Sequence, residues 1–103
     1  MALKPADFHV LLALTAGPLH GYGIMKEVER ESAGEVRLEI GSLYRLLDRL
    51  LEEELLEPGD VTDRRRYFKI TRVGRRALKV EAARLEGLVS LMRSRKLLPE
   101  SDA

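Results

Sequence analysis

The chain has 103 residues, of which 34% are charged and 45% hydrophobic, and its formal net charge is +1. This length fits one small domain with a limited core. Because the sequence contains no cysteine, disulfides, thiol catalysis and cysteine-based zinc or iron–sulfur sites are excluded. No apolar run approaches the length of a membrane span, and residues 1–16 lack a signal-peptide pattern, so we expect a cytoplasmic protein without a membrane partner.

Two helices are predicted in the first third of the chain. The first is apolar on nearly all sides and ends at Ala-Gly-Pro in positions 16–18, so we expect it to be buried from more than one direction. The second is expected over residues 22–32, where apolar and charged residues separate at helical spacing. Residues 36–40 could add a minor strand beside a later hairpin.

A third, strongly amphipathic helix is predicted over residues 41–54. Its apolar stripe, spaced at i, i+3, i+4, i+7 and i+8, consists of Leu43, Leu46, Leu47, Leu50 and Leu51. The opposite face carries Ser42, Tyr44, Arg45, Asp48 and Arg49, side chains suited to base edges or phosphates in a major groove. Three glutamates at the C-terminal end would be repelled by phosphates, so only the N-terminal half can enter a groove. Alternatively, this polar face is merely solvated.

A β-hairpin is predicted after this helix. Its first strand begins at Leu55 and ends at Pro58-Gly59, residues 60–63 form the turn, and the return strand covers residues 65–70. The turn and return strand carry Arg64, Arg65, Arg66 and Lys69. Guanidinium groups at a hairpin tip suit phosphate or minor-groove contacts, although arginine runs are also used for solubility.

Charge is distributed asymmetrically along the chain. Residues 61–80 contain eight basic residues against one acidic residue, whereas residues 27–60 contain four basic against eleven acidic residues. A molecule with one basic edge is typical of a directional nucleic-acid binder.

The last predicted element is a helix over residues 72–96, with Thr71 as its N-cap. Apolar residues recur along it at near-heptad spacing and exceed what the small domain can cover, which favours a homodimer over a helix folded back on its own domain. The expected interface consists of Leu78, Ala82, Leu85, Leu88, Val89 and Met92, with Leu11 of the first helix.

Several segments together resemble the PadR family of bacterial transcriptional regulators. They are LHGYGI at residues 19–24, GSLY at 41–44, RRRYFKIT at 64–71 and Gly74. The resemblance implies a winged-helix fold, a homodimer formed through the C-terminal helix, and repression through a two-fold operator, often relieved by a small molecule. The chain departs from the family pattern at residues 39–42, where Glu-Ile-Gly-Ser replaces Ser-Pro-Gly-Thr, and at Arg45, where proline is frequent.

We therefore expect a mainly α protein with a small β-hairpin: a winged helix-turn-helix domain (1–71), a long C-terminal dimerisation helix (72–97) and a flexible tail (98–103). The predicted DNA contacts are Gly41, Ser42, Tyr44, Arg45, Arg49, Arg64, Arg65, Arg66 and Lys69. No enzymatic motif, metal-ligand spacing or cofactor site is recognisable, and an aromatic-lined effector pocket is not indicated. The alternative function is a winged-helix module that docks an acidic protein partner.

Overall fold

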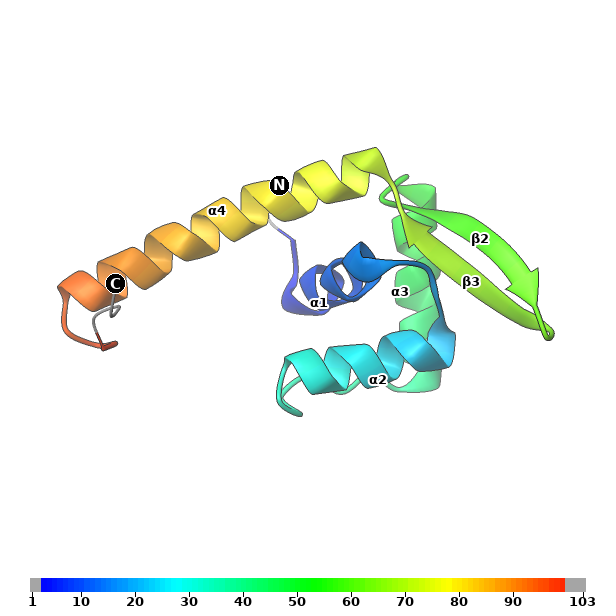
Figure 1. Cartoon of the computed structure of the whole chain (residues 1–103), viewed down its shortest axis with the longest axis horizontal. Coiled ribbons are helices and arrows are strands. Elements are labelled where there is room, and N and C mark those ends of the chain that lie inside the picture. Colours follow the sequence, from blue (N-terminus) through cyan, green and yellow to red (C-terminus); the bar gives the residue numbers. More distant parts are fainter. Residues whose placement is uncertain (1–2, 100–103) are drawn as a thin grey trace.

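The computed structural model describes residues 3–99. Three helices form a head: α1 (Pro5–Ala13), which runs into a short 3-10 helix, η1 (Leu14–Ala16), then α2 (Gly21–Glu31) and α3 (Ile40–Glu52). The strands are β1 (Leu19–His20), β2 (Leu56–Thr62) and β3 (Arg65–Ile70), and α4 (Arg72–Ser94) ends the regular structure. In Figure 1 the β2–β3 hairpin projects from one side of the head and α4 extends from the other.

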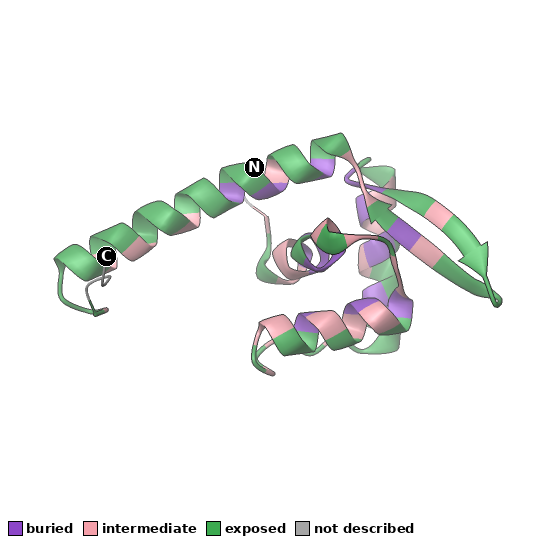
Figure 2. Cartoon of the chain, in the orientation of Figure 1, coloured by how far each residue is buried: buried purple, intermediate pink, exposed green. Residues whose placement is uncertain are grey.

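The core lies where α1, α2, α3 and the sheet meet, as the buried segments of Figure 2 show. The leucine stripe predicted for α3 is confirmed, because Leu43, Leu47 and Leu50 are fully buried. Phe68 is the largest fully buried side chain and attaches the sheet to this core. Burying one leucine side chain contributes about 1.5–3 kcal/mol, so the buried leucine stripe determines which face of α3 remains exposed.

The sheet has three antiparallel strands in the order β1-β3-β2. The predicted minor strand at residues 36–40 is wrong: these residues form no strand, and Ile40 already begins α3. Instead β1 takes the place beside β3, with Leu19 opposite Phe68 and His20 opposite Tyr67. Val36 and Leu38 pack against the core from the loop, which accounts for their apolar character without strand pairing.

The first strand of the hairpin is longer than predicted. Pro58 and Gly59 do not end it: β2 continues to Thr62, and the register shifts between Pro58 and Val61. Proline cannot donate a ladder hydrogen bond, and an irregularity of this kind lets a strand pass such a residue and still resume its pairing. The reversal occurs at residues 63 and 64, and the hairpin therefore reaches further from the head.

Helix α4 is fixed to the head at its first turn. The Thr71 side chain caps it as predicted, since its Oγ1 accepts a hydrogen bond of 2.9 Å from the backbone N–H of Gly74 and donates one of 2.7 Å to the Glu54 carbonyl. A Cβ on Gly74 would lie 2.2 Å from the Leu55 carbonyl oxygen, so this position admits no side chain without a backbone shift.

Beyond its first turns α4 leaves the head. Its buried residues are Gly74, Leu78 and Glu81, and its remaining length is exposed or half-buried (Figure 2). Two predicted dimer contacts therefore belong to the core of the single chain: Leu11 has no exposed surface and Leu78 is 8% exposed. Of the predicted flexible tail, residues 100–103 lie outside the described part of the chain.

Candidate nucleic-acid interface

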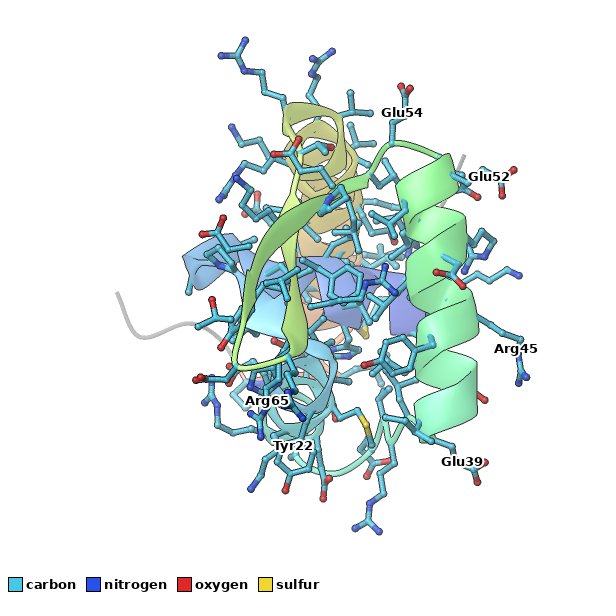
Figure 3. The ribbon with its side chains drawn as sticks, turned by 90° about the vertical axis from the view of Figure 1, so that its right-hand side faces the viewer. Tyr22, Glu39, Arg45, Glu52, Glu54 and Arg65 are labelled. Carbon is cyan, nitrogen blue, oxygen red and sulfur yellow. The ribbon has the colours of Figure 1, made fainter. Side chains whose placement is uncertain are left out.

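One end of the head collects several of the side chains expected to contact DNA. We call the β2–β3 hairpin the wing. Figure 3 shows Arg65 of the wing, Tyr22 of α2, and Glu39 and Arg45 at the start of α3 at this end, while Glu52 and Glu54 lie at the opposite end. The acidic end of α3 is thereby held away from the basic wing tip. This arrangement fits a helix that approaches a phosphate-rich groove with its N-terminal half.

The first turns of α3 present an open polar surface. Gly41, Ser42, Tyr44 and Arg45 are all exposed, and nothing lies within 4 Å of the position that a Cβ on Gly41 would take. Arg45 lies 3.4 Å from the Ser42 hydroxyl, a long contact that leaves its guanidinium free to turn outward. Glu39 is the N-cap, and its side chain makes no capping hydrogen bond. Glu39, which stands where the family pattern has serine, therefore leaves α3 without a side-chain cap.

Arg49 does not share this surface. Its Nη2 donates a 2.6 Å hydrogen bond to Oδ1 of Asp7 on α1, and its Nη1 lies 3.5 Å from Glu53. Asp7 is only 5% exposed, and its hydrogen bond raises the pKa of Arg49 above the ordinary value. In the chain alone Arg49 therefore links α3 to α1, and we propose this role in place of the predicted base contact.

The wing tip is a two-residue turn made by Asp63 and Arg64, which connects the paired residues Thr62 and Arg65. Both turn residues have positive φ, 52° and 63° respectively. Tight hairpins favour this geometry, but they usually place glycine or asparagine where this chain has arginine. A residue kept in an unfavourable backbone conformation is a sign of function, and here it exposes a guanidinium at the outermost point of the hairpin.

Lys69 is separated from the other predicted wing contacts. It lies opposite Glu57 near the base of the hairpin, with its Nζ 3.8 Å from a carboxylate oxygen of Glu57. Arg64, Arg65 and Arg66 are instead grouped at the tip. The structure thus divides the predicted basic cluster into a tip of three arginines and one lysine that already faces an acid.

A notch of about 280 Å³ lies between the wing tip, the start of α2 and the start of α3. Its lining residues come from all three elements: His20, Gly21, Tyr22, Ile40, Tyr44, Arg64, Arg65 and Arg66. A Cβ on Gly21 would lie 2.6 Å from the Tyr44 hydroxyl, so a larger residue at this position would displace the Tyr44 side chain. Ile40, His20 and Tyr22 are not among the DNA contacts predicted from the sequence, although Ile40 and Tyr22 are 56% and 58% exposed.

His20 holds two parts of this surface in place. Its Nδ1 accepts a 3.1 Å hydrogen bond from the backbone N–H of Gly23 and so caps α2, while its Nε2 lies 2.9 Å from Nη1 of Arg65. Its ring packs edge-on against Tyr67 with ring centroids 5.3 Å apart. His20 therefore connects the start of α2 with the wing.

A family model for transcriptional regulators, described as the Transcriptional regulator PadR-like family, matches residues 10–80. The chain belongs to the PadR-like family. A PadR family transcription regulator from Clostridium difficile R20291 has the same fold, with a TM-score of 0.75 and 20% identity over 88% of this chain and 97% of that one. Bacillus subtilis PadR in complex with operator DNA matches with a TM-score of 0.65 and 19% identity over 74% of this chain and 45% of that one.

A curated relative in Streptomyces fradiae, an uncharacterized 37.1 kDa protein in transposon TN4556, is 44% identical to this PadR-like chain over 92 residues. The alignment covers 86% of this chain and 26% of the relative, so the chain spans about a quarter of that protein's length. Within residues 3–99, no helix is long and apolar enough to cross a membrane, and no three His, Asp or Glu side chains are grouped as a metal site would require.

Proposed function

We propose that this PadR-like chain is a sequence-specific transcriptional repressor that binds a two-fold operator as a homodimer. The observation that carries the proposal is the joint exposure, at one end of the head, of the polar start of α3 and a wing tip of three arginines. Bacillus subtilis PadR, which has this fold, was crystallised with operator DNA.

Within the interface, α3 is proposed to read bases and the wing to bind the backbone. Arg45 is the candidate base reader, because it is exposed on the N-terminal half of α3 and has no acidic partner within the described residues. Ser42 and Tyr44 would contact phosphates or bases beside it, and Gly41 would let the backbone approach the duplex. Arg64, Arg65 and Arg66 would bind phosphates or the minor groove.

The homodimer is proposed to form through the distal part of α4. Leu88 and Leu91 are 42% and 44% exposed, and Leu85, Val89 and Met92 are half-buried. A groove of about 270 Å³ between α1 and α4, bordered by Phe8 and Leu85, continues this apolar surface onto the head. The α4 helix of a second copy of the chain would cover this apolar surface. The exposed Ala82 would let the two α4 helices approach closely. In such a dimer Phe8 would take the place that the sequence analysis gave to Leu11.

The first test is selection of genomic DNA fragments by the purified chain at near-physiological salt, followed by sequencing of the retained fragments. Enrichment of one two-fold symmetric site is the expected result. Retention without sequence preference would overturn the regulator assignment and favour the protein-docking alternative. Reporter expression under the selected site then distinguishes repression from activation, and its response to small molecules tests for an effector.

A further inference from the structure

We infer that His20 and Arg65 together hold one backbone phosphate of DNA in the notch, which makes His20 a DNA-contacting residue. This inference rests on the proposed function. It starts from a conflict in hydrogen bonding around the His20 ring, which lies 3.1 Å from one donor and 2.9 Å from another.

A neutral imidazole has one N–H donor and one acceptor nitrogen. The backbone N–H of Gly23 lies in the first turn of α2 and has no intrahelical acceptor, so it takes the lone pair of His20 Nδ1. The ring proton is then on Nε2, which faces the guanidinium of Arg65. Two donors therefore point into the same space, and neither can accept from the other. An anionic oxygen placed between them would accept from both.

The ring cannot easily turn away to resolve this conflict. The pairing of His20 with Tyr67 in the sheet, the edge-on contact of their rings and the cap on α2 all hold it. Arg65, by contrast, is exposed on the wing, and its side chain can shift by the small distance that an intervening oxygen requires. The site is thus fixed on the His20 side and adjustable on the Arg65 side.

The surroundings favour an anion. The eight residues that line the notch include three arginines and no acidic residue. Within residues 3–99, no carboxylate oxygen lies within 4.0 Å of the guanidinium nitrogens of Arg64, Arg65 or Arg66. Two phenols, those of Tyr22 and Tyr44, complete the lining, and phenols are common phosphate donors. We assign the anion to the DNA backbone because the notch adjoins the start of α3.

His20→Asn separates the two roles of the histidine. Asparagine is a good N-cap whose side-chain oxygen can still accept from Gly23, but it lacks a donor at the position of Nε2. We expect its thermal unfolding to match that of the wild type. Its affinity for duplex DNA should fall about ten- to a hundredfold, the cost of one hydrogen bond to a charged group, and by the same factor on the selected site and on an unrelated duplex.

The decisive measurement uses duplexes of the selected site in which one phosphate at a time is replaced by an uncharged methylphosphonate. His20→Asn and Arg65→Ala should both become insensitive to replacement at the same phosphate, while the other sensitive phosphates keep their effect. Arg95→Ala is a matched control away from the notch and should keep the full wild-type pattern. Millimolar inorganic phosphate should not compete with the duplex; effective competition would instead indicate a site for a free anion.

The inference is overturned if His20→Asn retains every sensitive phosphate of the wild type, or if the two variants lose different ones. In either case the selected site still binds, and the proposed function stands. A wild-type chain that binds all duplexes equally would contradict the regulator assignment, but the comparison of His20→Asn with wild type on one duplex would still test the phosphate contact. Failure to bind any duplex would refute both.

Discussion

Replacing Arg49 with alanine is expected to destabilise the fold and to leave base preference unchanged. The variant removes the guanidinium that pairs with Asp7, whose side chain is 6% exposed, and leaves that carboxylate buried without its 2.6 Å partner. Arg45→Ala is the matched control, because it removes the same side chain from an exposed position one turn earlier on α3.

The size of the effect follows from this geometry. A hydrogen bond to a charged group contributes about 1.5–3 kcal/mol, and removing one partner of a fully buried pair costs about 3–5 kcal/mol. The Arg49 side chain is 40% exposed, so water screens the pair and the lower range applies. We expect a loss of about 2 kcal/mol for Arg49→Ala, or about 10 °C in melting temperature for a chain of this size. Arg45→Ala should change stability by less than about 0.5 kcal/mol.

Urea denaturation followed by circular dichroism measures the stability of each variant, and selection of DNA sites measures its base preference. Arg45→Ala should relax preference at one base position by about 1–3 kcal/mol. The double variant Asp7→Ala/Arg49→Ala should lose less than the sum of the single losses. An Arg49→Ala protein that unfolds at the wild-type urea concentration but loses discrimination at one base pair would refute our reassignment.

Three further predictions concern the wing, the α4 surface and the half-buried Glu31. Glycine adopts a positive φ at no steric cost, so Arg64→Gly should stabilise the fold by up to about 1 kcal/mol and weaken binding to every duplex. A variant less stable than the wild type would show that the backbone of Arg64 is not strained. Leu88→Glu should give a folded monomer by analytical ultracentrifugation, and an unchanged mass would exclude the proposed interface. Burial raises the pKa of Glu31 above 4.5, so its contribution to stability is lost as pH rises through the folded-state pKa. Glu31→Gln should therefore gain stability relative to wild type across the interval just above pH 4.5, whereas a pH-independent difference would contradict this.

The helices were predictable because their patterns are local. Leucine spacing in α3, the Gly-Pro stop after the first helix and the cap at Thr71 are each read from neighbouring residues, and all three are seen in the structure. The strand beside the wing was not predictable in this way. Its two residues, Leu19 and His20, are too few to show alternation, and their partners in β3 lie 49 and 47 positions away in the sequence.

The same distinction between local patterns and distant contacts holds for the candidate site. Exposure at the start of α3 and at the wing tip followed from the pattern of the chain, because polar residues opposite a buried stripe must face outward. The partners of Arg49 and His20 did not, since Asp7 and Arg65 lie 42 and 45 positions away in the sequence. Only the tertiary fold determines which charged side chains are already engaged.

The attachment of α4 at Thr71 turns this helix into a lever arm. One hydroxyl bridges the end of α3 and the start of α4, and the backbone N–H of Thr71 donates a further hydrogen bond of 3.1 Å to the Leu55 carbonyl. A helix of 23 residues spans about 35 Å, so tilting it by about 5° at this junction would displace its far end by about 3 Å. In a dimer joined through α4, that displacement is close to the rise of one base pair, about 3.4 Å. The rigidity of this single junction would therefore set the tolerance of the chain for operators whose half-sites differ in spacing.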